Sequence, residues 1–367
     1  MKRWYIGLWI AIALLMVSCA TETPLPEPTA SPETGAEGTP VEEPQTVRVM
    51  TYGSFDISEE VIQVFESENN ATVQFLDAGD TGQMLSQAIL SKDNPLADVM
   101  YGLDNTFLSR ALNEGIFEPY EAKNLAQIPD RFELDPEHRV SPVDFGDVCL
   151  NYDKAALDEA GVEPPMSLEA LTEPEYAGMT VMENPASSSP GLAFLMTTID
   201  TLGEDEYLDY WAELAENDLL VVDDWSTAYY GEFSGGSGSE GTRPIVVSYA
   251  TSPAAEVYFS EGALETPPTG AVTAPGTCFR QIEFVGVLKN AENPELARAF
   301  VEFALSETFQ EDIPLHMFVF PTNENAELPQ VFQDFAIKAD EPASLQVETI
   351  EENRRDWIDA WTEVVLQ

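Results

Sequence analysis

Short apolar strands alternate with amphipathic helical segments early in the sequence, and this alternation constrains the fold more than any other feature. Residues 47–50, 71–78 and 97–103 each predict a strand, and apolar residues at helical spacing follow each of them. Strands that alternate with helices form a parallel sheet whose two faces the helices cover. The chain is therefore predicted to be an α/β protein.

Turn-forming and polar residues follow each predicted strand. In open α/β sheets ligands bind beyond the carboxyl ends of the strands, so residues 51–55, 77–82 and 102–105 are expected to line one crevice. Aromatic and small polar residues recur at these and later strand ends, which is typical of sites that bind small polar molecules. The residues are Tyr52 with Ser54, Asp104 with Asn105, Trp225 with Ser226 and Tyr229, and Tyr249 with Ser252.

The N-terminus has the order of an export signal. Lys2 and Arg3 precede an apolar stretch that is too short to span a membrane comfortably, and Ser18 and Cys19 follow it. The segment MVSC resembles a bacterial lipobox, which predicts a lipoprotein signal peptide over residues 1–19 and lipid on Cys19, although a cut by ordinary signal peptidase fits as well. Residues 20–45 are rich in Pro and Glu and predict a disordered linker, so the folded part is expected to begin near Thr46.

Composition excludes several classes of partner and of chemistry. The 66 Asp and Glu against 16 Lys and Arg give a net charge of −50, which argues against binding to nucleic acid or to anionic lipid headgroups. The sequence contains no nucleotide-binding, serine-hydrolase or zinc motif. Its histidines, His138 and His316, have no neighbour at ligand spacing. We therefore predict no catalytic residue, no metal and no cofactor.

Two cysteines remain once Cys19 is assigned to the signal. An exported protein lives where disulfides persist, so a bridge between Cys149 and Cys278 is one interpretation. Two buried free thiols fit the sequence equally well.

An ordered set of segments resembles one family. TYGSF, ADVMYGLDN, SPVDFGDVCLNYDK, NPASSSPGL, WSTAYYG, IVVSYATSPA and NRRDWIDAW together resemble the thiamine-binding proteins of bacterial ABC importers, which have the type II periplasmic-binding-protein fold. The resemblance covers nearly all of residues 46–365. It implies an exported, monomeric binding protein that is not an enzyme and that passes its ligand to a permease and ATPase complex. The protein would be anchored by lipid to the outer face of the cytoplasmic membrane, or be periplasmic.

The resemblance also implies the division into lobes. One lobe is expected to combine residues 46–141 with 279–312, and the other residues 142–278 with 313–367, with ligand clamped between them. Cys149 and Cys278 lie beside the two implied crossings, which brings a disulfide between them to even odds against free thiols.

Matching positions imply a set of ligand-binding residues, several of which the strand-end pattern already contains. Ser188 corresponds to a family serine at a helix N-terminus, where a phosphate could bind. At the position of a family tyrosine this chain has Ala255, so that wall of the site is thinned or supplied by Tyr258. The complete set is Tyr52, Ser54, Asp80, Asp104, Asn105, Ser188, Trp225, Tyr229, Tyr249, Ser252 and Phe318.

Three other functions compete with thiamine binding. The adjacent Tyr229 and Tyr230 resemble the tyrosines of ferric-iron binding proteins with the same fold. A polyamine binder would also use an acidic cleft. An exported hydrolase is the alternative from another class, but no nucleophile and base can be paired from the sequence.

Overall fold

A computed structural model describes residues 44–367, which form a mixed α/β structure on one sheet. The predicted signal peptide, Cys19 and nearly all of the linker lie outside the described residues. No helix in the described part of the chain is long and apolar enough to cross a membrane. The strands are β1 (Gln45–Thr51), β2 (Ala71–Asp77), β3 (Val99–Asp104), β4 (Ser141–Asp153), β5 (Thr180–Glu183), β6 (Leu220–Val222), β7 (Ile245–Tyr249), β8 (Thr269–Val272), β9 (Phe279–Val287) and β10 (Phe320–Pro321).

The sheet has two parallel groups of strands joined by an antiparallel centre. Its order is β2-β1-β3-β9-β4-β7-β5-β6, with β8 and β10 pairing beside β4. β1 is parallel to β2 and β3, and β5 is parallel to β6 and β7, as the alternation of strands and helices predicts. In the centre, β9 is antiparallel to both β3 and β4, and β4 is antiparallel to β7. A wholly parallel sheet is therefore wrong, because β4 and β9 run directly from one group to the other.

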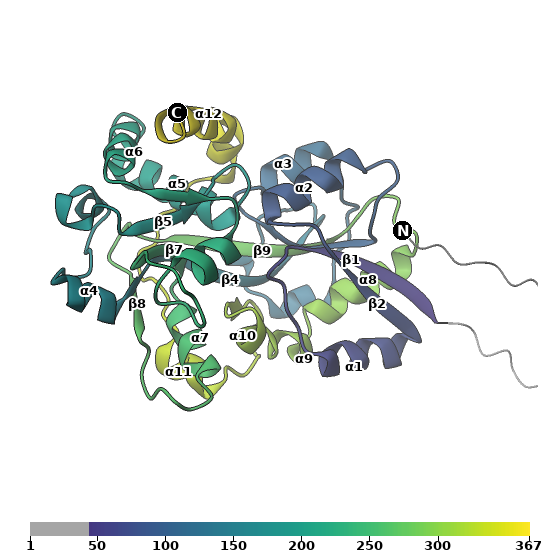
Figure 1. Cartoon of the computed structure of the whole chain (residues 1–367). Coiled ribbons are helices and arrows are strands. Elements are labelled where there is room, and N and C mark those ends of the chain that lie inside the picture. Colours follow the sequence, from purple (N-terminus) through teal and green to yellow (C-terminus); the bar gives the residue numbers. More distant parts are fainter. Residues whose placement is uncertain (1–43) are drawn as a thin grey trace, which may run out of the picture. The chain divides into compact units, whose positions relative to one another are not determined.

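The two long central strands connect two lobes. The first part of β4, Ser141–Val148, pairs with β9, and its last part, Val148–Tyr152, pairs with β7. Figure 1 shows β4 and β9 running along the middle, between the β1–β3 group and the β5–β7 group. We call the β1–β3 group with its helices the first lobe, and the β5–β7 group with its helices the second lobe.

Helices cover the strands of both lobes. Those of the first lobe are α1 (Glu59–Asn69), α2 (Thr81–Leu90), α3 (Leu108–Glu114), α8 (Pro294–Ala304) and α9 (Glu307–Gln310). Those of the second lobe are α4 (Lys154–Ala160), α5 (Ser189–Leu202), α6 (Tyr207–Glu216), η5 (Thr227–Glu232), α7 (Ser252–Phe259), α10 (Ile313–His316), α11 (Gln330–Phe335) and α12 (Val347–Val365). Short 3₁₀ turns lie at Lys123–Gln127, Asp130–Phe132, Glu169–Thr172 and Pro174–Tyr176.

Helix α5 occupies the interior of the second lobe and aims its N-terminus at the junction of the lobes. Its residues from Ser189 to Ile199 are all buried, and the helix packs on β4, β5, β7 and β9. Ser188 is the N-cap of this helix, and Ser189 is its first residue. Ser189 turns its hydroxyl to Asp104 of the first lobe.

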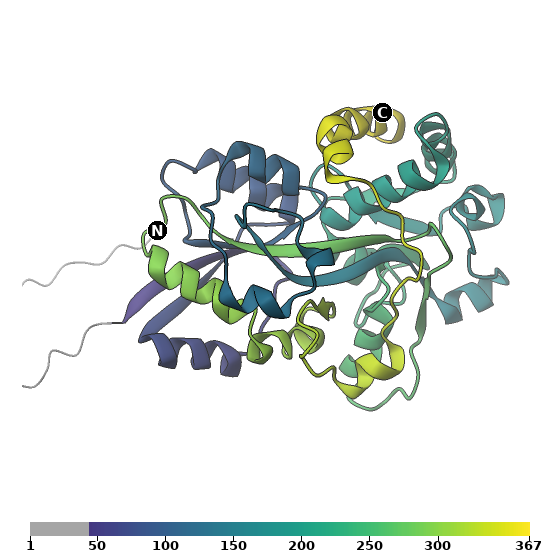
Figure 2. The ribbon, with the colours of Figure 1, turned by 180° about the vertical axis from the view of Figure 1, so that it is seen from behind.

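The C-terminal helix α12 packs on helices of both lobes, α6 and α3. Trp357 and Trp361 are buried, and the Trp361 ring meets Trp211 of α6 edge to face at 5.7 Å. The two tryptophans therefore pack α12 against the rest of the fold. In Figure 2 the yellow segment that leads from α11 to α12 passes along the second lobe.

A disulfide and an ion pair hold the centre of the sheet. Cys149 of β4 is bonded to Cys278, which directly precedes β9. Asp147 of β4 faces Arg280 of β9, and two hydrogen bonds of 2.8 Å join the guanidinium to both carboxylate oxygens. Both links lie where the strands pass between lobes, so they fix the register of the crossing segments.

Candidate functional site

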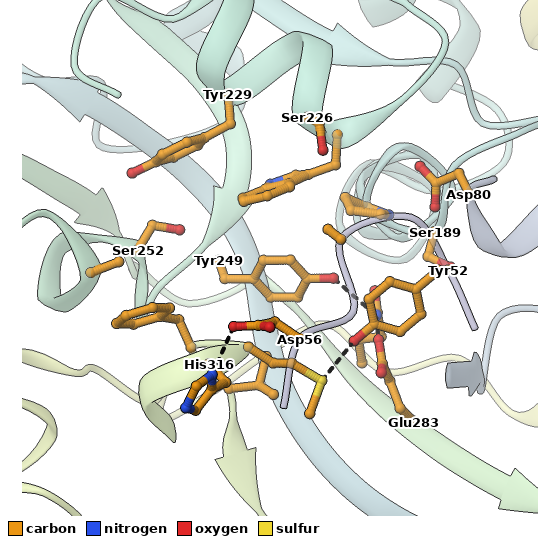
Figure 3. Close-up of a pocket in the computed structure, with 18 of the residues that line it drawn as sticks. Tyr52, Asp56, Asp80, Ser189, Ser226, Tyr229, Tyr249, Ser252, Glu283 and His316 are labelled. Carbon is orange, nitrogen blue, oxygen red and sulfur yellow. Dashed lines mark hydrogen bonds and ion pairs between the residues drawn. The ribbon is translucent and has the colours of Figure 1, made fainter. Parts of the chain in front are cut away.

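A cavity of about 280 Å³ lies between the lobes and takes its walls from both of them. Loops at the carboxyl ends of β1, β2 and β7 contribute to it, as do the start of α5, the turn η5 and strand β9. In Figure 3 the Tyr249 ring lies centrally among the drawn residues, with Tyr229 on one side and with Tyr52 and Glu283 on the other. The lining residues are Tyr52, Ser54, Asp56, Asp80, Thr81, Ser189, Pro190, Trp225, Ser226, Tyr229, Tyr230, Tyr249, Ser252, Ala255, Phe259, Gln281, Glu283, His316, Met317, Phe318 and Val319.

Most of the residues singled out in the sequence lie together in this cavity. They come from strand ends far apart in the chain, and the lobe arrangement brings them to one place. The residues that line the cavity as expected are Tyr52, Ser54, Asp80, Trp225, Tyr229, Tyr249, Ser252 and Phe318.

Asp104, Asn105 and Ser188 lie outside the cavity lining, and the side chains of Asp104 and Asn105 are hydrogen-bonded within the protein. Asp104 accepts hydrogen bonds from Ser189 and from the backbone N–H of Thr106. Asn105 bonds the backbone of β9 through both ends of its amide. Ser188 is wholly buried beside Asp80. Asp104 and Asn105 therefore position Ser189, which lines the cavity, and strand β9.

An aromatic pair forms the second-lobe wall. The rings of Trp225 and Tyr229 stack with centroids 5.1 Å apart and planes inclined by 17°. The Trp225 indole N–H donates to Ser248 at 3.0 Å, which fixes the ring. The Tyr229 hydroxyl donates to the buried Glu256 carboxylate at 2.8 Å, so this phenol offers its ring and not its oxygen to the cavity.

The loop of residues 234–243 folds against the same carboxylate. The backbone N–H of Ser237 donates to Glu256 at 3.3 Å, and the Ser237 hydroxyl donates to its other oxygen. For the wall at Ala255 the sequence left two options, a thinner wall or a contribution from Tyr258, and the structure places Ala255 and Phe259 in the lining. Phe259 lines the cavity and packs on Phe318, whereas Tyr258 is absent from the lining.

Tyr52 forms the facing wall in the first lobe. Gly102 makes room for its ring, because a Cβ on Gly102 would lie 2.2 Å from the Tyr52 Cδ1 atom. Gly102 also has a φ of +90°, which glycine adopts without strain. The Tyr52 hydroxyl donates to the Met317 sulfur at 3.3 Å. Tyr52 is thus held between β3 and the segment that leads from α10 to β10.

The inner end of the cavity, which we call the floor, contains carboxyl and amide groups that the sequence analysis missed. Gln281 and Glu283 are two apart on β9 and both line the cavity. Asp144 of β4 pairs directly with Glu283 in the strand register. The available signal was the spacing of Gln281 and Glu283, which are two apart in the strand FRQIEFVGV and therefore point to one face of the sheet.

Burial governs the charge on these carboxyl groups. It raises the pKa of Asp144 to about 7. It raises the pKa of Glu283 well above its usual range, and repulsion from Asp144 adds to the rise. Burial also raises the pKa of Asp80 to about 6, and the hydrogen bond from the Thr81 backbone N–H partly offsets this rise. Near neutral pH the Asp144 and Glu283 pair therefore retains a proton until a positive or N–H-donating partner arrives.

A histidine within hydrogen-bonding distance of an aspartate lies at the mouth of the cavity, and the sequence also did not reveal this pair. His316 Nδ1 lies 2.7 Å from an Asp56 oxygen, and His316 Nε2 lies 3.6 Å from Asp312. Asp56 belongs to the loop after β1, and His316 ends α10. This pair joins the two segments at the edge of the cavity (Figure 3).

A second cavity of about 220 Å³ adjoins the first and shares Tyr52, Asp80 and Trp225 with it. It adds Asp77 and Asp224 to the acidic lining. Within residues 44–367, neither cavity has a lysine or arginine in its wall. Aromatic faces beside carboxylates are suited to a cationic ring system.

The described residues are less suited to binding a metal ion. Among the described residues, no three or more His, Cys, Asp or Glu side chains are grouped to hold one. Tyr229 donates its phenol to Glu256, and the Tyr230 ring stands at 82° to it. The adjacent tyrosines therefore do not present two phenol oxygens to one point.

Two lobes joined by long strands, with a polar and aromatic cavity between them, define a solute-binding protein of the type II periplasmic fold. Residues 94–339 match the family described as "Bacterial extracellular solute-binding protein", and the chain belongs to this family. The family consists of solute-binding transport proteins and not of enzymes.

Within this family, the chain is similar to several proteins that are named as thiamine-binding. The thiamine-binding periplasmic protein of Brucella suis biovar 1 is 30% identical over 86% of this chain and 91% of that protein. The thiamine-binding periplasmic protein of Escherichia coli K12 is 29% identical over 89% of this chain and 95% of that protein. A solved structure described as a periplasmic thiamin binding protein has a TM-score of 0.76 at 26% identity, and covers 88% of this chain and 96% of that one.

Proposed function

We propose that this protein is the extracytoplasmic solute-binding component of an ABC importer and that it binds thiamine or a thiamine phosphate in the cavity between its lobes. The observation that carries the proposal is the pairing of a Trp225 and Tyr229 wall with carboxylates and no lining cation. Thiamine joins a cationic thiazolium to an aminopyrimidine, so aromatic faces and acidic groups suit both of its rings. The names of the similar proteins support the same ligand.

Transport follows from closure of the lobes on the ligand. We propose lobe boundaries at residues 46–141 with 279–312 and at residues 142–278 with 313–367, which matches the way α8 packs on β1 and β3 and α11 packs on α7. The backbone N–H of Gly82 in the first lobe donates to the carbonyl of Ser187 in the second at 3.1 Å. The closed, monomeric protein would then present ligand to a permease and its ATPase.

The N-terminal region bears on the cellular location of the protein. We propose that Cys19 carries lipid after removal of residues 1–18 and that the linker of residues 20–45 separates the folded body from the outer face of the cytoplasmic membrane. Intact-mass measurement of the protein from a bacterial host tests this, because an unmodified N-terminus downstream of Cys19 contradicts the anchor.

Calorimetry and tryptophan fluorescence test the ligand. Thiamine is expected to bind one to one and to quench fluorescence. Trp225→Ala is expected to weaken binding by about 2 kcal/mol, roughly thirtyfold, because it removes the stacking surface. Leu90→Ala, a change at an exposed apolar residue far from the cavity lining, is the control.

Other outcomes would replace the proposal. Tight binding of Fe³⁺ or of spermidine, with no heat and no thermal shift from thiamine or its phosphates, would assign the cavity to those ligands. Conversion of thiamine to a new product by the purified protein would assign it to an enzyme.

A further inference from the structure

The floor of the cavity contains buried hydrogen-bond acceptors that have no partner. Glu283 Oε2 and Gln281 Oε1 make no hydrogen bond within the described structure. Glu283 is 5% exposed and Gln281 is 1% exposed, and both line the cavity. A buried acceptor without a donor costs about 1–3 kcal/mol, so two of them in one site point to a donor that a ligand supplies.

The hydrogen bonds that do form on the floor fix which atoms face the ligand. The Gln281 amide N–H₂ donates to Glu283 Oε1 at 3.0 Å and to the Tyr249 hydroxyl at 3.0 Å. Glu283 Oε1 needs a donor, so this arrangement orients the amide with Oε1 as its free atom. What remains for a ligand is the amide oxygen of Gln281, which accepts, and Glu283 Oε2, which accepts once the proton shared with Asp144 is displaced.

Protein cations do not supply the missing donor. Arg280 is the basic residue of the same strand, and it is held by Asp147 through two hydrogen bonds and by the carbonyl of Ala339. Tyr101 donates its hydroxyl to Asp144 at 2.8 Å, behind Glu283. Asp144 Oδ1 also has no hydrogen-bond partner, and the proton that the Asp144 and Glu283 pair retains can lie between its oxygen and Glu283 Oε2. Gln281 Oε1 has no such internal donor, so a bound molecule with N–H groups would supply one there and would replace the shared proton at Glu283.

We propose that Glu283 and Gln281 recognise the exocyclic amino group of the ligand's aminopyrimidine ring, so that the site selects an amino heterocycle over its oxo counterpart. This inference rests on the proposed thiamine-binding function and deepens it. An amino group offers two N–H donors to the two free acceptors. An oxo group at the same ring position offers an acceptor, which would leave Glu283 Oε2 facing another oxygen.

Thiamine and oxythiamine, in which an oxo group replaces the amino group, test the inference. Calorimetry on the wild-type protein is expected to show at least about 100-fold tighter binding of thiamine, because sites built around an N–H donor reject analogues that lack it. Glu283→Gln supplies an amide N–H that can meet the oxo group. Its preference for thiamine is expected to fall to within about tenfold.

Asp56→Asn is the matched control, because it also removes one carboxylate from the cavity lining but acts at the mouth. It is expected to change the affinities of the two compounds by the same factor. Circular dichroism and denaturant midpoints check the fold of each variant, and the wild-type comparison needs no variant.

The outcomes separate this inference from the function on which it rests. Wild-type protein that binds thiamine and oxythiamine within about threefold of each other overturns the amino-group assignment and leaves thiamine binding standing. An unchanged preference in a folded Glu283→Gln protein overturns the role of Glu283. Wild-type protein that binds neither compound overturns both the inference and the function.

Discussion

Strands β4 and β9 carry two buried carboxylate pairs with opposite surroundings. Asp147 faces Arg280, and every oxygen of its carboxylate has a hydrogen-bond partner. Three residues away along β4, Asp144 faces Glu283, a second acid, and each has an oxygen without a partner. Like charges directly opposite in an antiparallel pair are destabilising. The first pair therefore stabilises the crossing between lobes with a cation, whereas the second pair retains a proton in place of a cation.

The largest expected change in stability follows from removing Arg280, the cation of the Asp147 and Arg280 pair. Arg280→Ala leaves Asp147 buried and unpaired, so the free energy of unfolding is expected to fall by about 3 kcal/mol. Urea unfolding followed by circular dichroism measures it. The double variant Asp147→Asn with Arg280→Gln is the control and should recover much of the loss. If Arg280→Ala unfolds at the wild-type midpoint, the pair does not stabilise the crossing.

The second pair is expected to make stability fall as the pH rises. In the folded protein the pKa of Asp144 is raised to about 7, whereas an unfolded Asp loses its proton near pH 4. Between these values the folded state holds a proton that the unfolded state has lost. Each pH unit then costs about 1.4 kcal/mol for one such group.

Asp144→Asn isolates that effect from the other acids of the chain. The difference between the wild-type and Asp144→Asn unfolding free energies should change across pH 5–7 and level off above it. Parallel curves would show that Asp144 titrates normally in the folded protein. The titratable or polar groups that face this pair are Tyr101 and Asp104 of β3, Tyr52 after β1, Tyr249 of β7 and Gln281 of β9.

The smallest expected effect is an increase in the free energy of unfolding, whereas Arg280→Ala is expected to decrease it. Glu283→Gln removes a buried acid from beside another and keeps an oxygen for the Gln281 amide. The ligand-free protein is therefore expected to become more stable by about 1 kcal/mol at pH 8, while it loses its preference for thiamine. Denaturant midpoints at pH 8 measure the change. A large loss of stability would mean that Glu283 supports the fold and not the site.

Part of the site follows from the sequence, because local signals mark it. Tyr52, Trp225 and Tyr249 stand beside turn-forming residues at strand ends, and such residues meet at one edge of an α/β sheet. The bond between Cys149 and Cys278 was one of two interpretations that the sequence left open, and the structure contains it. Ser188 and Asp104 also stand at a helix end and a strand end, but they are buried among their neighbours and do not line the cavity, because residue type and spacing do not set the direction of a side chain.

The residues that meet at the floor of the cavity are set by the register between β4 and β9, two strands that are far apart in the chain. A register shift between Pro142 and Asp144 places Asp144, and not Val143, opposite Glu283. Such a shift has no local signature, and in a chain with 66 acids no single pair of carboxylates stands out.

The sequence by itself determined the α/β class, the strand ends that approach the ligand and the acidic character of the protein, because each depends on residue type and local spacing. The tertiary structure alone decided which acids are paired and which acceptors are left free. Those properties arise when β4 and β9, far apart in the chain, align residue against residue in a buried sheet. Burial then makes a missing partner costly enough to define a binding site.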